Sequence, residues 1–312
     1  MVKVRAAANR TLTCAPEEIA ELAPHLLELE RPCRPEELEG RIINQELGAT
    51  LKFLPPGFVD LMILDPPYNL AKDFHGRIFR QRQHTDYQEW FRKLLLGLKP
   101  LLKPQASLYV CSDWRTSLII APLLEESFRL RNRITWEREK GRGARKNWKN
   151  SSEDIWFCTV GKEYFFDIEA VKLKRRVRAP YRDSRRTPKD WQEEGGERFR
   201  LTHPSNLWSD ITVPFWSMPE NTDHPTQKPE KLLAKLILAS SRKGNFVFDP
   251  FLGSGTSAVV AAKLGRRFCG IEINREYCCW ALKRLARARQ HPAIQGYADG
   301  IFWERNSLKP SK

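Results

Sequence analysis

One segment constrains the fold of this chain more than any other part of the sequence. Residues 247–274 read VFDPFLGSGTSAVVAAKLGRRFCGIEIN, which is an apolar run, a turn with two glycines, a stretch of small and apolar residues, and a second apolar run. The pattern predicts a strand, a helix that begins at about Thr256, and another strand within fewer than thirty residues. Strands that alternate with helices in this way are typical of a parallel sheet.

The same alternation extends over most of the chain. The apolar run Phe58–Leu64 stops at strong turn formers and therefore reads as a buried strand. Further strands are predicted at RIIN, SLYVCS, RNRITWE and EDIWFCTV, and helices near residues 47–54, 87–98, 114–128, 228–241 and 274–290. We therefore expect an α/β fold with a Rossmann-like, doubly wound and mostly parallel sheet.

The glycine turn and the strand that follows it predict a nucleoside-binding site. Gly253 and Gly255 let the backbone pass close to a ligand, and the start of the next helix offers unpaired N–H groups. Glu272 ends the second strand nineteen positions after Gly253, where an acidic side chain can accept both ribose hydroxyls. No lysine follows the glycines, as a phosphate-binding loop would need.

A second candidate site follows the strand at residues 58–64. The sequence DPPYN places Asp65, Pro66, Pro67 and Tyr68 at the carboxyl end of that strand, which is the ligand edge of an open α/β sheet. The prolines fix φ and donate no backbone hydrogen bond, so the turn is stiff and its carbonyls can accept hydrogen bonds from a ligand amino group. Taken alone, the same residues could form only a turn.

The charge of the chain predicts a polyanionic partner. Among 312 residues, 53 are Lys or Arg and 38 are Asp or Glu, a net charge of +15. The basic residues gather in two clusters, at 138–149 and 171–190, which also contain Trp148, Tyr181 and Trp191. Arginine beside aromatic rings favours nucleic acid, whereas the alternative is a solvated basic surface.

The cysteine spacing predicts no metal site, and the apolar runs predict no membrane span. Seven cysteines form no Cys-x-x-Cys pair, which indicates neither a disulfide framework nor a zinc site. No apolar run has the length of a membrane span, and the amino terminus lacks the apolar core of a signal peptide. We expect a reduced, cytoplasmic protein.

The chain divides into five segments by pattern. Residues 1–40 predict an amino-terminal arm of short helices, and residues 41–170 and 222–292 carry the strand–helix alternation. Residues 171–221 show no clear period and are too long for an ordinary connector, so they are predicted to be a functional insertion. Residues 293–312 are a tail to which the sequence assigns no role.

These motifs resemble those of one enzyme family. DPFLGSGTSAVVAAKLGRRFCGIEIN is similar to the S-adenosylmethionine loop of DNA amino-methyltransferases, and DPPYN is similar to their catalytic motif. The catalytic motif comes first, a basic insertion follows, and DHPTQKPEKLLAKLI precedes the cofactor loop, an order that resembles the circularly permuted beta group. The resemblance covers residues 41–290 approximately.

The resemblance implies a reaction and a cofactor. Family members transfer a methyl group from S-adenosylmethionine to N6 of adenine or N4 of cytosine. Asp65 and the Pro66 carbonyl would accept hydrogen bonds from the target amine, and Tyr68 would stack on a base that has left the duplex. The implied cofactor contacts are Asp249, Phe251, Gly253, Ser254, Gly255, Thr256 and Glu272, with His224, Thr226 and Lys228 at the methionine end.

The implied substrate is double-stranded DNA. The insertion at 171–221 corresponds to the target-recognition region of the family. The residues predicted to contact DNA are Arg142, Arg145, Lys146, Lys174, Arg175, Arg176, Arg178, Arg182, Arg185 and Arg186. A homodimer is one predicted state, and any restriction endonuclease of the same system would be a separate chain.

Several alternatives compete with this interpretation. An Asp-led motif favours adenine, but cytosine N4 stays open. Methylation at cytosine C5 needs a Pro-Cys nucleophile, and Pro32-Cys33 lies in the amino-terminal arm, away from the predicted sheet edge. Protein-glutamine and RNA methyltransferases usually have an Asn-led motif after the cofactor loop. A non-catalytic DNA-binding protein that has kept the fold is the alternative from another class.

Overall fold

The computed structural model describes residues 6–74, 77–138, 146–177, 181–187 and 190–304. Its centre is an eight-stranded sheet in the order β1-β13-β12-β2-β5-β7-β6-β11. β7 is antiparallel to both of its neighbours, and the other strand pairs are parallel. The strands are β1 (Arg41–Ile43), β2 (Val59–Leu64), β5 (Leu102–Ser112), β6 (Arg129–Glu137), β7 (Ser152–Thr159), β11 (Leu207–Trp208), β12 (Phe246–Asp249) and β13 (Arg267–Ile271). The prediction of a mostly parallel, doubly wound sheet is confirmed.

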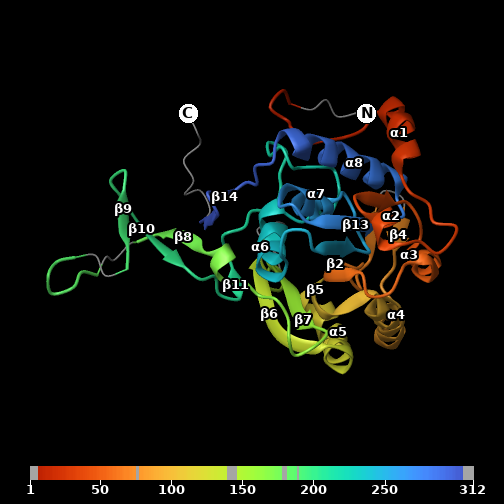
Figure 1. The fold of residues 1–312 in the computed structure, drawn as a ribbon, viewed down its shortest axis with the longest axis horizontal. Helices are drawn as coiled ribbons and strands as arrows, with labels where there is room; N and C mark the ends of the chain where they lie inside the picture. The colour runs from red at the N-terminus through yellow and green to blue at the C-terminus, as the bar shows by residue number, and fades with distance from the viewer. Residues whose placement is uncertain (1–5, 75–76, 139–145, 178–180, 188–189, 305–312) are drawn as a thin grey trace.

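Helices cover both faces of this sheet (Figure 1). Alternate residues of β2 face opposite sides, as a strand period of two requires. Met62 and Leu64 pack in one core with α4 and α5, whereas Leu61 and Ile63 pack in another with α6 and α7. The helices are α3 (Leu47–Thr50), α4 (His84–Leu98), α5 (Trp114–Ser127), α6 (Glu230–Ser240), α7 (Thr256–Lys263) and α8 (Arg275–Gln290).

Capping side chains begin α5 and α8, which are among the helices that follow strands of the main sheet. Asp113 follows β5 and accepts a hydrogen bond from the Thr116 N–H at 3.1 Å, which caps α5. Asn274 follows β13 and accepts one from the Glu276 N–H at 2.9 Å, which caps α8. Both caps therefore lie at the carboxyl edge of the sheet. The hairpin of β3 (Lys72–Phe74) and β4 (Arg77–Phe79) comes between β2 and α4.

A second, five-stranded sheet projects from the main body (Figure 1). Its order is β14-β15-β8-β10-β9, with β8 (Leu173–Arg176), β9 (Gln192–Glu194), β10 (Glu197–Thr202), β14 (Tyr297–Ala298) and β15 (Ile301–Trp303). The sequence showed no period in this region, so these strands were not predicted. β15 pairs in parallel with β8, which joins the carboxyl-terminal segment to the insertion. The Lys231 ammonium donates to the carbonyls of Asp210 and Trp303 and connects this sheet to α6.

The amino-terminal segment also packs on the main domain. It contains the short helices α1 (Pro16–Leu22) and α2 (Pro35–Leu38). Leu12 is buried against Tyr277 and Trp280 of α8. All seven cysteines are free thiols, and the described residues contain no group of side chains suited to a metal ion. No helix in the described ranges is both long and apolar enough to cross a membrane.

Candidate active site

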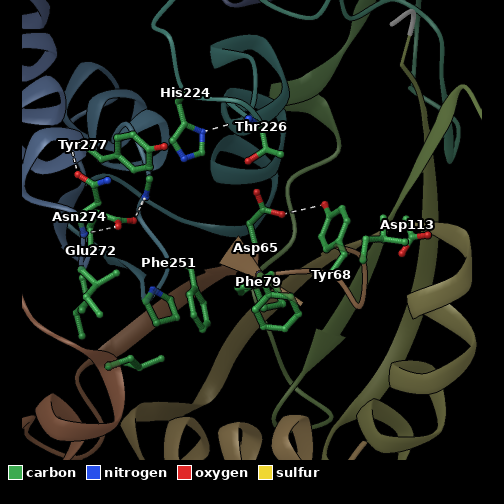
Figure 2. Close-up of a pocket in the computed structure, with 18 of the residues that line it drawn as sticks. Asp65, Tyr68, Phe79, Asp113, His224, Thr226, Phe251, Glu272, Asn274 and Tyr277 are labelled. Atoms are coloured by element: carbon green, nitrogen blue, oxygen red, sulfur yellow. Dashed lines mark hydrogen bonds between the residues drawn. The ribbon is translucent and has the colours of Figure 1, made fainter. Parts of the chain in front are cut away.

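A cavity of about 670 Å³ opens at the carboxyl edge of the main sheet. Its wall includes residues that follow β1, β13, β12, β2 and β5, which are five consecutive and parallel strands of this sheet. Figure 2 shows Glu272 and Asn274 on one side of the cavity and Tyr68 on the other, with Asp65 between them. The two candidate sites of the sequence, far apart along the chain, therefore share one space.

The turn after β2 presents a carboxylate to the cavity. The Tyr68 hydroxyl donates to Asp65 Oδ1 at 2.9 Å (Figure 2). The hydroxyl of Tyr87, a buried residue of α4, donates to the Pro67 carbonyl at 2.9 Å and so links the turn to this helix. Asp65, Pro66, Pro67 and Tyr68 all line the cavity. Burial, and then the nearby Asp65 carboxylate, raise the pKa of Tyr68 well above its usual value, so Tyr68 stays a neutral donor.

Lys228 reaches the same turn from the segment before α6. Its ammonium donates to Asp65 Oδ2 at 2.6 Å and to the Tyr68 hydroxyl at 3.2 Å. It also lies 3.4 Å from Oε2 of Glu153, a residue of β7 that pairs with Arg138. Lys228, a predicted cofactor contact, is not among the described residues that line the cavity. Phe251 and Gly253, which are also predicted cofactor contacts, do line it.

The glycine turn after β12 holds the second carboxylate. Gly253 has φ +54° and its N–H donates to Glu272 Oε2 at 2.9 Å. The Asn274 N–H donates to Glu272 Oε1 at 2.8 Å, so two backbone amides orient this carboxylate at the end of β13. Gly253, Phe251 and Glu272 line the cavity. Each carboxylate oxygen still has acceptor capacity for a ligand hydroxyl.

His224 and Thr226 also line the cavity (Figure 2). The Thr226 N–H donates to His224 Nδ1 at 3.3 Å, and the imidazole packs edge-on against Tyr277 with ring centres 4.6 Å apart. A Cβ on Gly253 would lie 3.0 Å from His224 Nε2. The absence of a side chain at Gly253 thus gives the imidazole its place over the turn.

Four predicted cofactor residues are buried outside the cavity wall. Asp249 accepts hydrogen bonds from the Phe251 N–H at 3.0 Å and the Ser257 hydroxyl at 2.5 Å, and burial raises its pKa to about 7. Arg284 of α8 donates to the Ser254 carbonyl and to the Thr256 hydroxyl, both at 2.9 Å. Gly255 has φ +83° and packs against α8. These contacts shape the turn that presents Gly253.

Several cavity residues were not predicted from the sequence. Phe79 and Trp90 form an aromatic wall with ring centres 6.2 Å apart, and the Arg82 guanidinium lies over both rings. Asn274 and Glu153 also line the cavity. Asn274 follows Glu272 at the start of a predicted helix, which was a usable signal, whereas Glu153 enters the site only through the pairing of β7.

The residues predicted to contact DNA have different surroundings. Arg142, Arg145 and Arg178 lie outside the described residues. Lys174 pairs with Glu194 between the rings of Phe199 and Trp303, an environment inside the second sheet. Two more are close to carboxylates and the rest lie in exposed loops: Arg175 near Glu304 at 3.8 Å, Arg176 near Glu197 at 3.4 Å, and Lys146, Arg182, Arg185 and Arg186 in loops.

The comparison with known proteins assigns the family. The profile of the family described as "DNA methylase" matches residues 59–283, which is most of the chain and contains both halves of the cavity. The chain belongs to this family. Its members use S-adenosylmethionine as methyl donor and modify the exocyclic amino groups of DNA bases, as the resemblance of the two motifs implied.

Individual relatives agree with this assignment. "DNA adenine methyltransferase YhdJ" of Escherichia coli is 34% identical over 255 residues, which cover 81% of this chain and 84% of the relative. "Type II methyltransferase M.HpaI" of Haemophilus parainfluenzae is 32% identical and covers 80% of this chain and 74% of its own length.

Solved structures share the fold of this DNA methylase. The M1.HpyAVI–SAM complex has a TM-score of 0.54 at 24% identity and covers 78% of this chain and 98% of its own. The cytosine-N4-specific PvuII DNA methyltransferase has a TM-score of 0.59 at 17% identity and covers 79% of this chain and 86% of its own. At such identities the likeness concerns the fold alone.

Proposed function

We propose that this DNA methylase transfers a methyl group from S-adenosylmethionine to N6 of an adenine that has left the duplex. The observation that carries the proposal is the shared cavity. A carboxylate turn suited to an amine, at Asp65, and a glycine turn suited to a nucleoside, at Gly253 and Glu272, face one space. The cavity volume of about 670 Å³ is within the range of sites that bind small molecules and cofactors.

The residues around the glycine turn fit S-adenosylmethionine. Gly253 offers a surface without a side chain, and the Glu272 carboxylate is held by two backbone amides with acceptor capacity for ribose hydroxyls. Phe251 and Ile273 add apolar surface for a ring. When bound, the cofactor supplies an electrophilic methyl group on a sulfonium sulfur, which keeps the electron pair of the broken S–C bond.

Asp65 would make the target amine a better nucleophile. The nitrogen of an exocyclic amine is weakly nucleophilic because its lone pair is delocalised into the ring. Hydrogen bonds from the amine to the Asp65 carboxylate and to the Pro66 carbonyl would localise that pair and orient it. The new N–C bond forms from this pair, and the nitrogen then gives up one proton, for which the Asp65 carboxylate is an acceptor.

The aromatic residues at the same end of the cavity would hold the base. Tyr68 lines the cavity beside Asp65, and Phe79 and Trp90 form a second apolar wall. Bases that enzymes modify are extruded from the duplex and stack on such side chains. The Asp-led motif and the 34% identity to a relative named an adenine methyltransferase support adenine over cytosine.

The exposed basic loops support a DNA surface around the cavity. Asn150 and Ser152 line the cavity, and Lys146, Trp148 and Lys149 precede them in the chain. Trp148 is 94% exposed, which is unusual for tryptophan and favours contact with an unstacked base. Arg182, Arg185 and Arg186 lie in the exposed segment between β8 and β9 of the second sheet, where they would add phosphate contacts.

Salt dependence tests this DNA surface. Because each phosphate contact releases counterions, the affinity should fall steeply as salt rises. Arg185→Ala should reduce the slope of log K against log salt by about 1, whereas Arg92→Ala on α4 should leave the slope unchanged. Binding that does not respond to salt would remove the basic loops from the DNA surface.

The modified nucleoside tests the proposed function itself. The purified protein is incubated with unmethylated bacterial DNA and S-adenosylmethionine, the DNA is digested, and the nucleosides are identified by mass spectrometry. We expect N6-methyladenine with the wild type and no modified nucleoside with Asp65→Ala. N4-methylcytosine would keep the mechanism and overturn the base, and no modification by the wild type would overturn the function.

The relatives also suggest a biological setting. The Haemophilus relative is named a type II methyltransferase, which supports a partnership with a separate restriction endonuclease. A homodimer is a further prediction, which light scattering would check. A DNA substrate and seven free cysteines support the cytoplasm as the location.

A further inference from the structure

Four charged side chains form a compact cluster at one end of the cavity. Lys228 Nζ lies 2.6 Å from Asp65 Oδ2 and 3.4 Å from Glu153 Oε2, and it donates to the Tyr68 hydroxyl at 3.2 Å. Arg138 pairs with the other oxygen of Glu153. The cluster contains two cations and two carboxylates, so the loss of any one of these side chains leaves a net charge.

Burial makes this balance important. Lys228 is 8% exposed and Glu153 is 4% exposed. Burial opposes the charged form of Lys228, but the carboxylates of Asp65 and Glu153 outweigh it and raise the pKa of the lysine above its usual value. Lys228 therefore remains an ammonium at assay pH. An ammonium fixed between two carboxylates restricts the position of both.

Lys228 affects the cavity through Asp65. Among the described residues, the cavity wall includes Asp65, Tyr68, Arg138 and Glu153, and Lys228 contacts three of these four from outside the wall. Its shortest contact is with Asp65. A lysine in this place can orient the carboxylate without contacting the methyl donor.

We propose that Lys228 and Glu153 are positioning residues for the methyl transfer. Their ion pair holds Oδ2 of Asp65, while the Tyr68 hydroxyl holds Oδ1. Each carboxylate oxygen accepts more than one hydrogen bond, so both keep acceptor capacity for the amine of the base. This inference rests on the proposed function, because it assigns a task to two further residues at the same site.

The competing assignment places Lys228 at the methionine end of the cofactor. The two assignments predict different kinetic effects. A cofactor contact that is lost raises the Kd for the cofactor and leaves the rate at saturation unchanged. A lost positioning contact leaves the Kd unchanged and lowers the rate at saturation, because a displaced carboxylate no longer orients the amine.

Lys228→Met separates these effects, since it removes the charge and keeps the length of the side chain. We expect the single-turnover rate at saturating cofactor and DNA to fall about 100-fold. The Kd for S-adenosylmethionine, measured by calorimetry, should stay within about threefold, which corresponds to less than one ordinary hydrogen bond. Lys243→Met is the matched control, because Lys243 is exposed near the amino end of β12, and it should change neither value.

Rescue by a conservative variant provides a readout that a purely structural role would not move. Lys228→Arg keeps a cation beside Asp65 and Glu153. We expect it to restore most of the saturated rate that Lys228→Met loses, with an unchanged Kd for S-adenosylmethionine. The titratable and charged groups that face Lys228 are Asp65, Tyr68, Cys111, Glu153 and, through Glu153, Arg138.

Glu153→Gln is the second variant, and it keeps the test decisive if Lys228→Met does not fold. It retains the size of the side chain and removes the charge that holds the ammonium from the far side. We expect a rate about tenfold below wild type with unchanged cofactor affinity. Wild-type rates in both variants, or a weaker cofactor Kd with an unchanged saturated rate, would overturn the positioning role.

The outcomes also separate this inference from the proposed function. If the wild type binds S-adenosylmethionine but modifies no nucleoside, the proposed function fails. If the wild type methylates DNA and the variants equal it, only the positioning role fails. Loss of rate that Lys228→Arg does not restore, together with a lower melting temperature, would show a purely structural role and would likewise overturn the inference.

Discussion

Two Asp-Pro turns end neighbouring strands of the main sheet, yet their carboxylates have opposite surroundings. β12 pairs in parallel with β2, so the turns that begin at Asp65 and Asp249 lie at the same edge. Asp65 faces the cavity and is held by Lys228, which is 163 positions away in the sequence. Asp249 is buried, and its hydrogen bonds come from the neighbouring residues Phe251 and Ser257.

The difference shows that the position at a strand end does not by itself make a carboxylate reactive. A long-range cation keeps Asp65 at the surface of the cavity, where it can accept a hydrogen bond from a ligand. The local hydrogen bonds of Asp249 instead fold the backbone so that Gly253 borders the cavity. We therefore expect the same dipeptide to serve chemistry in one turn and shape in the other.

Exchange of each aspartate for asparagine should give the largest difference in methyl-transfer rate between the two turns. Asp65→Asn removes the acceptor charge, and we expect the single-turnover rate to fall about 1000-fold with unchanged cofactor affinity. Asp249→Asn should stay within about tenfold of wild type, because the side chain acts only on the turn. Transfer of a tritiated methyl group measures both rates. Equal losses in the two variants would mean that the turns share one role.

Substitution of each glycine in the turn after β12 should distinguish an effect on stability from an effect on cofactor binding. A Cβ on Gly255 would lie 2.4 Å from the Ala281 Cβ of α8 at φ +83°, so Gly255→Ala should cost about 3 kcal/mol of unfolding free energy. A Cβ on Gly253 would meet His224 at 3.0 Å, and Gly253→Ala should cost about 1 kcal/mol.

Urea unfolding and cofactor calorimetry on the two glycine variants provide the measurement. Gly253 lines the cavity, so Gly253→Ala should weaken cofactor binding more than Gly255→Ala does once each variant is folded. If Gly255→Ala proves stable and loses the cofactor, the turn would act as one binding unit, and the division between shape and contact would be wrong.

Much of this arrangement could be predicted from the sequence, because it follows from where strands end. Asp65 and Glu272 each come directly after an apolar run, Gly253 lies four positions after the end of β12, and parallel strands bring such residues to one edge. Glu153 could not be found in this way. It enters the site because β7 inserts antiparallel between β5 and β6, and the sequence does not fix that pairing.

The second sheet could not be predicted for a different reason. β8 has the sequence Leu-Lys-Arg-Arg and therefore lacks the alternation that identifies a strand. Its apolar partner is Phe302 of β15, which pairs with Leu173 from the other end of the chain. The Lys174 ammonium lies over the rings of Phe199 and Trp303. From the sequence alone, a lysine is expected to be an exposed surface residue.

Glu272 tests the binding half of the comparison with a smaller effect. Its carboxylate is oriented by two backbone amides. We expect Glu272→Ala to raise the Kd for S-adenosylmethionine about 20-fold through loss of charged hydrogen bonds. Glu272→Gln keeps one acceptor and should lose less. Calorimetry measures both values, and an unchanged Kd in the alanine variant would remove Glu272 from the ribose site.

Asp249 provides a separate test, in the pH dependence of stability. Burial raises its pKa to about 7, so the folded protein holds this proton more tightly than the unfolded chain, in which an aspartate has a pKa of about 3.9. The resulting stabilisation is complete below the unfolded pKa and is lost as the pH rises through about 7. Asp249→Asn imitates the protonated group and does not titrate.

The free energy of unfolding of the wild type, minus that of Asp249→Asn, should therefore fall by about 2 kcal/mol between about pH 5 and 8. Burial also raises the pKa of Glu220 to about 7, but that group is present in both proteins and cancels in the difference. Urea unfolding at several pH values measures it. A constant difference would mean that the hydrogen bonds from Ser257 and Phe251 keep Asp249 ionised in the folded protein.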